Sequence, residues 1–350
     1  MPSFVSFASF VLIALFVAGP ADAFDRAVTF TVENVNRSLV PCPTDGGTVE
    51  IRGHLTGPDP LPSALTVYLH GLGFDEVFWR FREVPGLDFA SELAARGHAS
   101  LTIDRLGYGA STTPANGTTG SCLGAQADIA HQIVEQLRRG AYAIEEGVAP
   151  AFDEVVLAGH SVGGAIAQIE AYSFGDIDGL LVMEWADLGF SADITVAFVQ
   201  AGLDCVLNPN GYSYMGHTDA DFDHLFFNTK RPLLPALPIL DKPPTADPAV
   251  IAAVNEIRSQ DPCGDKLSVP AAIVVSTVGV ALIDVPTLLL CGGDDAIFPA
   301  PACDVQRLRF LAAKDLTATT IPLTGHAATI GFTAAGVRDA VSSWLSARGF

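Results

Sequence analysis

Short apolar runs recur along the chain from about residue 64 onward. They read ALTVYLHG, ASLTIDRLG, EVVLAGHS, GLLVMEWAD, PTLLLCGG and ATTIPLTG. Near-continuous apolar runs of this length are typical of strands buried on both faces of a parallel sheet. Between them lie segments with apolar residues at helical spacing, such as residues 124–147. This alternation of strands and helices predicts an α/β fold with a doubly wound, mostly parallel sheet.

Two earlier stretches follow a different pattern. In AVTFTV (27–32) and GTVEIRGHLTG (47–57) apolar and polar residues alternate, with Val49 and Ile51 set against Glu50 and Arg52. Such alternation is typical of an antiparallel strand with one exposed face. The turn-like CPTDGGT between the two stretches favours a hairpin. With the six buried runs, the pattern predicts an eight-stranded sheet.

The strand–helix alternation stops after Asp187. Residues 188–283 are irregular, and NPNGYSYMG, LLPALPILDKPP and DPCGD separate short helix-like pieces. The sheet pattern resumes at IDVPTLLLCGG. We therefore expect a core built from residues 24–187 and 284–350, with a mainly helical cap inserted at 188–283.

The first 23 residues resemble an export signal. Phe10–Ala18 is an unbroken apolar run, and Gly19-Pro20 and the small residues up to Ala23 follow it. Such a run with an A-x-A-like end is typical of a cleaved signal peptide and is short for a bilayer span. We expect cleavage after Ala23, secretion, and no stable membrane insertion afterwards. The alternative is an uncleaved anchor, because no Lys or Arg precedes the run.

Composition and charge narrow the class of protein. The chain has 350 residues, 49% hydrophobic and 17% charged, which is typical of a well-packed globular protein. Its 39 acidic and 19 basic residues give a formal net charge of -20. Phosphate backbones would be repelled by this charge, so nucleic acid is excluded as a partner.

Six cysteines fit an exported protein, in which disulfides persist. Cys205 and Cys263 both lie within 188–283 and are the expected pair, although six cysteines allow fifteen full pairings. Cys291 lies in an apolar strand-like run and is interpreted as a buried small side chain. No C-x-x-C spacing occurs, which argues against structural zinc and thioredoxin-type redox chemistry.

The stretch LAGHSVGG (157–164) places Ser161 in the spacing G-x-S-x-G. An apolar strand precedes it and small residues that can open a helix follow it. This context predicts a sharp strand-to-helix turn that exposes the Ser161 hydroxyl as a nucleophile. The same turn directs the amide of Val162 toward a developing oxyanion. The alternative is a serine that only forms a turn or caps a helix.

A serine nucleophile needs a base, and the base needs an acid. His326 follows the last strand-like run, in IPLTGHAAT, and is the expected base. Asp295, in GGDDAIFP, is the expected acid; Asp294 and Asp187 remain alternatives. The other histidines considered have packing or solvated roles in this interpretation: His54, His131 and His160.

A second oxyanion donor is expected in the loop after the first buried run. In HGLG the amide of Leu72 would face Ser161, and His70 would hydrogen-bond the loop.

These motifs resemble the α/β-hydrolase superfamily over about residues 25–350. HGLG and DRLGYGAS (104–111) look like its signature loops, and Ser161, Asp295 and His326 follow its order. The resemblance implies a Ser-His-Asp triad that needs no metal or organic cofactor, and a cap that shapes the substrate pocket. A serine at 161 sets the chain apart from the dehalogenases and epoxide hydrolases of this fold, which use aspartate there.

The leading hypothesis is a secreted serine hydrolase that cleaves a carboxylic ester of a small molecule or lipid through an acyl-enzyme. Alternatives on the same triad are a lipase with an apolar lid that includes residues 232–240, a cofactor-free haloperoxidase-like or acyl-transfer enzyme, and an amidase or aminopeptidase. An aminopeptidase would need cap acids for the substrate amine, and the candidates are Asp204, Asp219, Asp221 and Asp223. The non-enzyme alternative is a catalytically silent binding protein of the same fold.

Overall fold

A computed structural model describes residues 24–115, 117–229 and 242–350. The predicted signal peptide (1–23) and the apolar run at 232–240 lie outside the described residues.

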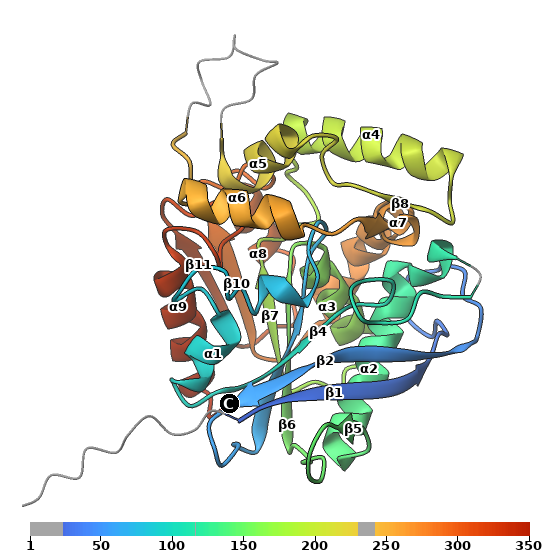
Figure 1. Ribbon diagram of the computed structural model, residues 1–350, viewed down its shortest axis with the longest axis vertical. Coiled ribbons are helices and arrows are strands. Elements are labelled where there is room, and N and C mark those ends of the chain that lie inside the picture. The colour runs from blue at the N-terminus through green and yellow to red at the C-terminus, as the bar shows by residue number, and fades with distance from the viewer. Residues whose placement is uncertain (1–23, 116, 230–241) are drawn as a thin grey trace, which may run out of the picture.

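The centre of the molecule is one large twisted sheet (Figure 1). Its strands, in chain order, are β1 (Phe24–Glu33), β2 (Thr48–Gly57), β3 (Ala64–Leu69), β4 (Ala99–Ile103), β5 (Ala143–Ile144), β6 (Glu154–His160), β7 (Gly179–Met183), β10 (Thr287–Gly292) and β11 (Leu316–Ile321). They include all eight predicted strands; the additional one, β5, has only two residues. The predicted fold class is therefore confirmed.

The strand order is β11-β10-β7-β6-β3-β4-β2-β1-β5. Neighbours from β11 to β4 are parallel, and β2, β1 and β5 add antiparallel pairs. Every residue of β3, β4 and β7 is buried, which explains why their sequences are largely apolar. By contrast, β11 is partly exposed because it forms one edge of the sheet.

Helices cover both faces of the sheet (Figure 1). On one face α1 contacts α9, and on the other α2 contacts α3. The helices of the core, in chain order, are α1 (Phe89–Ala94), α2 (Leu123–Arg139), α3 (Val162–Ser173), α8 (Ala302–Arg307) and α9 (Ala334–Ser346). Short 3-10 turns occur at η1 (Glu76–Phe78) and η2 (Thr118–Ser121).

The helix predicted within 124–147 is shorter than its pattern. It ends at Arg139 because Gly140 adopts the left-handed conformation, with φ 59°, and its N–H bonds the last turn. The apolar Ala143 and Ile144 beyond it pair with β1 as β5 instead of continuing the helix.

The described part of residues 188–283 is mainly helical, and Figure 1 shows α4, α5 and α6 lying across one end of the sheet. Its elements are α4 (Ala192–Leu207), β8 (Tyr212–Ser213), α5 (Asp219–Phe227), α6 (Pro248–Ile257), β9 (Asp261–Pro262), α7 (Cys263–Gly279) and the 3-10 turn η4 (Val280–Leu282). The strands before and after this segment, β7 and β10, are neighbours in the sheet.

Residues Cys263–Leu282, which comprise α7 and η4, are long and apolar enough to cross a membrane. In the fold, 44% of this stretch is buried, and α7 packs against α2, α3 and α4. Contacts inside the protein thus explain part of its apolar character.

Three disulfides link the six cysteines: Cys42–Cys122, Cys205–Cys263 and Cys291–Cys303. The predicted pair Cys205–Cys263 is confirmed. The interpretation of Cys291 as an unpaired buried side chain is wrong, because Cys303 at the second residue of α8 comes within bonding distance of it.

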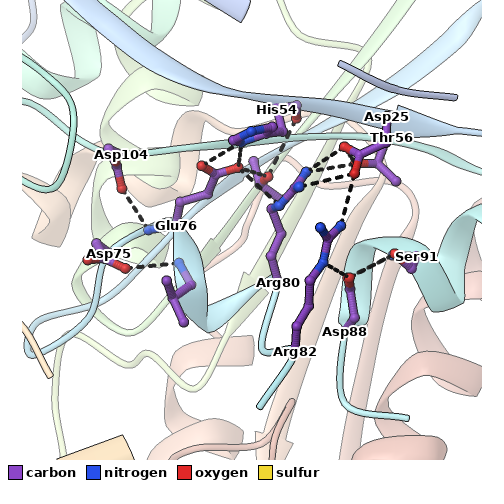
Figure 2. A network of polar contacts seen from close by, with 12 residues as sticks. Asp25, His54, Thr56, Asp75, Glu76, Arg80, Arg82, Asp88, Ser91 and Asp104 are labelled. Carbon is purple, nitrogen blue, oxygen red and sulfur yellow. Dashed lines mark hydrogen bonds and ion pairs between the residues drawn. The ribbon is translucent and has the colours of Figure 1, made fainter. Parts of the chain in front are cut away.

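A polar network holds the loop after β3 against the hairpin (Figure 2). The Glu76 carboxylate, at the start of η1, accepts hydrogen bonds from His54 Nδ1 at 2.8 Å and Thr102 Oγ1 at 2.6 Å. Four residues later Arg80 pairs with Asp25 of β1 at 2.8 Å. His54 therefore serves the packing of this loop.

A second network is fully buried and joins the core to the 188–283 segment. Arg105, after β4, pairs with Asp265 of α7 at 2.7 Å, and both side chains are 2% exposed or less. The Tyr108 hydroxyl donates to Asp265 at 2.9 Å. Asp261 of β9 pairs with Lys266 at 2.9 Å. Each charged group of this network has an oppositely charged partner in the interior, where an unpaired charge is strongly destabilising.

We predict that Asp265→Ala lowers the free energy of unfolding by about 3–5 kcal/mol, because it leaves the Arg105 guanidinium buried without its carboxylate. Urea unfolding at neutral pH measures the change. The matched control is Asp315→Ala, which breaks the partly exposed Arg348–Asp315 pair and should cost about 1 kcal/mol or less. Equal losses in the two variants would contradict the prediction.

Candidate active site

Ser161 occupies the turn between β6 and α3. Its φ is 54° and its ψ is -125°, a conformation that costs a non-glycine residue free energy. The Ser161 N–H donates to the carbonyl of Met183 on β7 at 2.8 Å, which anchors the turn. Gly163 is required two residues later, because a Cβ there would lie 2.2 Å from the Leu69 carbonyl oxygen of β3. The strand-to-helix turn expected from G-x-S-x-G is present.

His326 lies in the loop after β11 and is fully buried. Its Nδ1 is 2.9 Å from Oδ2 of Asp295, in the loop after β10. The other Asp295 oxygen accepts the N–H groups of Ile297 at 2.7 Å and Phe298 at 3.1 Å. Burial by itself raises the pKa of Asp295, but His326 and these hydrogen bonds outweigh it and lower the pKa to about 2. The carboxylate is therefore ionised at any physiological pH.

The two alternatives to Asp295 as the acid, Asp294 and Asp187, have other partners in the structure. Asp294 Oδ1 lies 3.1 Å from Lys242 Nζ. Asp187 is buried against Arg309 at 3.0 Å and accepts from the indole of Trp185 at 3.0 Å. Asp295 is thus the one of the three aspartates that the structure brings to His326.

His160, which precedes Ser161, links the two halves of the site. Its Nε2–H donates to the backbone carbonyl of His326 at 2.7 Å, and its ring stacks on Phe78 at 4.3 Å. Burial lowers the pKa of His160 to about 3, so its ring is neutral. The expected packing role is therefore accompanied by a hydrogen bond that fixes the His326 backbone.

Leu72 and Val162 line the same cavity as Ser161. Val162 is the first residue of α3, so its N–H has no acceptor within the helix. The loop that carries Leu72 is held by its neighbours: His70 Nδ1–H donates to Gly71 O at 2.9 Å, and Gly73 N–H donates to Asp261 at 2.6 Å.

The His326 Nε2 is buried and has no hydrogen-bond partner. The bond from Ser161 Oγ to this nitrogen is therefore not formed in this conformation. Catalytic hydrogen bonds are often long or unformed before substrate binds. The His326 ring contacts Phe226 and Phe298, at centroid distances of 5.1 and 5.8 Å, and both phenyl rings line the Ser161 cavity.

The cavity beside Ser161 has a volume of about 360 Å³ and an almost wholly apolar wall. Most of its lining comes from residues 188–283, which contribute Phe190, Ile194, Phe198, Val199, Met215 and Ile273 among others. The core contributes Trp185, Ile297 and Phe298 beside the residues already described. No charged side chain is among the residues that line it.

Two groups of side chains in the described residues are close enough to hold a metal ion. They are Glu184 with Asp295 and His326, and His131 with Glu170 and Asp176, and in each the candidate ligand atoms lie within 4.8 Å of one another. In both, the histidine Nδ1 already pairs with the aspartate, and burial raises the pKa of the glutamate well above its usual value. In each group, a protonated glutamate beside the aspartate carboxylate explains why the three side chains lie close together without a metal ion.

Sequence reasoning missed Glu184. It directly follows β7, three residues before the alternative acid Asp187, and its side chain is buried. No motif marks it, because its neighbours Asp295 and His326 come from loops far along the chain.

A comparison with curated proteins gave no match. Similar solved structures include a thermophilic esterase from Thermogutta terrifontis, 19% identical, with a TM-score of 0.61 over 91% of this chain and 98% of that one. A monoacylglycerol lipase from Paleococcus ferrophilus is 19% identical, with a TM-score of 0.58 over 81% and 94%. A bromoperoxidase from Bacillus anthracis is 17% identical, with a TM-score of 0.59 over 91% and 99%.

At these identities the likeness to solved structures concerns the fold. The sequence itself matches a family model described as the alpha/beta hydrolase family over residues 66–339, which is well over half of the chain. The protein therefore belongs to the alpha/beta hydrolase family.

Proposed function

We propose that this protein is a secreted serine hydrolase that cleaves carboxylic esters with Ser161, His326 and Asp295. The observation that carries the proposal is Ser161 on a strained turn, facing an apolar cavity beside a buried His326–Asp295 pair. The esterase and lipase among the similar structures support hydrolysis of esters.

In this mechanism the Ser161 Oγ attacks the ester carbonyl while His326 Nε2 takes its proton. Asp295, held by two backbone N–H groups, keeps the Nδ1 proton of His326 in place and stabilises the imidazolium. The amides of Leu72 and Val162 bind the oxyanion, and each such donor is worth roughly 3 kcal/mol in the transition state. His326 then protonates the departing alcohol, and water releases the acid by the reverse sequence.

The cavity favours an uncharged substrate over a peptide with a free amine. An ammonium group would need a carboxylate partner, and the lining offers none. The acids considered for that role are engaged elsewhere: Asp219 pairs with Arg258 at 2.8 Å, and Asp223 accepts from Asn255 at 3.1 Å. Asp204 lies 3.8 Å from His217. Residues 188–283 act in this proposal as a cap that supplies the apolar wall.

Secretion is supported by the pairing of all six cysteines, since disulfides persist in oxidising compartments. The predicted signal peptide at 1–23 would provide the route.

We expect Ser161→Ala to abolish p-nitrophenyl ester hydrolysis, because the nucleophile is removed, and to leave the thermal unfolding midpoint nearly unchanged. A fluorophosphonate probe should label the wild-type protein at Ser161, as located by peptide mass spectrometry. The matched control is Ser343→Ala, at an exposed position of α9, which should keep full activity and labelling. An active Ser161→Ala variant would refute the mechanism, and an unlabelled wild type would favour a binding protein.

The cavity also predicts chain-length selectivity. Its volume is near the lower end for ligand pockets, and at about 30 Å³ per water-sized group it holds roughly twelve such groups. We expect kcat/KM for p-nitrophenyl esters to rise from acetate to medium-length acyl chains and to fall for palmitate.

Ile273→Trp should shift this optimum to shorter chains, because Ile273 of α7 lines the cavity. Val274→Trp is the control on the same helix, since Val274 is 68% exposed and is not among the residues that line the cavity. The assay is the same ester series with both variants. An unchanged optimum in Ile273→Trp would place the acyl group outside this cavity.

A further inference from the structure

Glu184 is held in the catalytic region by an unusual backbone. It has φ 52°, in the left-handed region, directly after β7. Its N–H donates to the Leu290 carbonyl of β10 at 2.9 Å, so the strained conformation is fixed by the sheet. Such strain persists where surrounding structure enforces it, and it concentrates at functional sites.

The absence of a side chain at Gly292 leaves room for the carboxyl group of Glu184. A Cβ at Gly292, the last residue of β10, would lie 3.1 Å from Glu184 Oε2 and 2.4 Å from the Thr324 carbonyl oxygen. Both Glu184 carboxyl oxygens are buried, and the backbone N–H of Gly292 is the donor that interacts with the carboxyl group. The structure thus buries a glutamate side chain where one backbone donor would stabilise an ionised carboxylate only weakly.

Asp295 supplies the missing partner. An aspartate carboxylate has about four acceptor positions. Three are used by the N–H groups of Ile297, Phe298 and His326. One Glu184 oxygen lies within 4.8 Å of the Asp295 and His326 ligand atoms, and the Glu184 and Asp295 side chains are within hydrogen-bonding reach. A protonated Glu184 can fill the fourth position by donating its O–H, whereas an ionised Glu184 would repel Asp295.

We propose that Glu184 is a positioning residue that stays protonated at neutral pH and donates a hydrogen bond to Asp295, thereby setting the pH range in which His326 works as a base. This inference rests on the proposed ester hydrolysis by Ser161. The burial of Glu184, together with the nearby Asp295 charge, raises its pKa well above the usual value, in agreement with the geometry.

Other titratable groups around this trio do not replace Glu184. His160 on β6 is neutral, since burial lowers its pKa to about 3. Lys242 is paired with Asp294 at 3.1 Å. On the β7 side, Asp187 is paired with Arg309. Among the described residues of these elements, Glu184 is therefore the group that can donate to Asp295.

The test compares Glu184→Gln, which keeps an N–H donor of similar size, with Glu184→Leu, which has none. In Glu184→Leu the full charge of Asp295 acts on the His326 imidazolium, which then keeps its proton to higher pH. The acid limb of kcat/KM should move up by about half to one pH unit. We expect kcat to fall by roughly ten- to a hundredfold, with KM nearly unchanged. Glu184→Gln should keep the acid limb of kcat/KM at the wild-type pH, because its side-chain N–H can still donate to Asp295.

The matched control is Glu170→Gln. Glu170 is a second buried glutamate beside an aspartate–histidine pair, in which His131 Nδ1 lies 2.8 Å from Asp176. It lies nine residues beyond Ser161 on α3, about 13 Å along the helix. Removing this carboxyl should leave the pH profile unchanged. An equal shift in Glu170→Gln, or no shift in Glu184→Leu, would overturn the proposal, as would a Glu184→Gln profile like that of Glu184→Leu.

If Glu184→Leu does not fold, a second measurement tests the protonation of Glu184 without that variant. The infrared difference between the wild type and Glu184→Gln at neutral pH should contain the carbonyl stretch of a protonated carboxylic acid. Carboxylate bands alone would overturn the proposal. Fluorophosphonate labelling of each variant separates the two hypotheses: failure of ester hydrolysis leaves wild-type Ser161 unlabelled, whereas failure of the Glu184 proposal leaves a labelled, active enzyme with an unshifted profile.

Discussion

The buried pairing of Arg105 with Asp265 is the constraint on which the arrangement of the site depends. The two side chains come from segments far apart along the chain, the loop after β4 and the first turn of α7, and they meet at 2.7 Å in the buried interior. Burying both charges carries a large desolvation cost that only close pairing offsets. The contact therefore specifies one position of α7 over the sheet, and with it one wall of the cavity.

The same network reaches the loop that faces Ser161. Asp261, next to α7, accepts the Gly73 N–H at 2.6 Å and the Tyr108 hydroxyl at 3.2 Å. The backbone beside Leu72 is thus fixed by a residue of the 188–283 segment, so the segment that shapes the cavity also orients a proposed oxyanion donor. Preorganised donors of this kind need no rearrangement when charge develops in the transition state.

Much of the fold could be predicted from the sequence because its signals are local. Buried strands are near-continuous apolar runs, and the sharp turn at Ser161 needs small neighbours that can be seen within eight residues. The pair Cys205–Cys263 was predictable because both cysteines lie in one irregular segment. Cys291–Cys303 was not, because the apolar run around Cys291 has the same pattern whether or not its sulfur is bonded. Glu184 is a stronger case: neither its left-handed backbone nor its approach to Asp295 leaves a trace in the residues around it.

Two groups of the same residue types show why composition alone does not define a site. Glu170, Asp176 and His131 repeat the chemistry of Glu184, Asp295 and His326, with histidine–aspartate distances of 2.8 and 2.9 Å. The His131 ring stacks on Phe174 at 4.2 Å, partly exposed at the surface. The His326 ring is fully buried and contacts two phenyl rings that line the Ser161 cavity. The first group joins α2 to α3 and the loop after it, whereas the second adjoins an apolar cavity and a strained serine. The proposed difference in function follows from what the fold places beside each histidine.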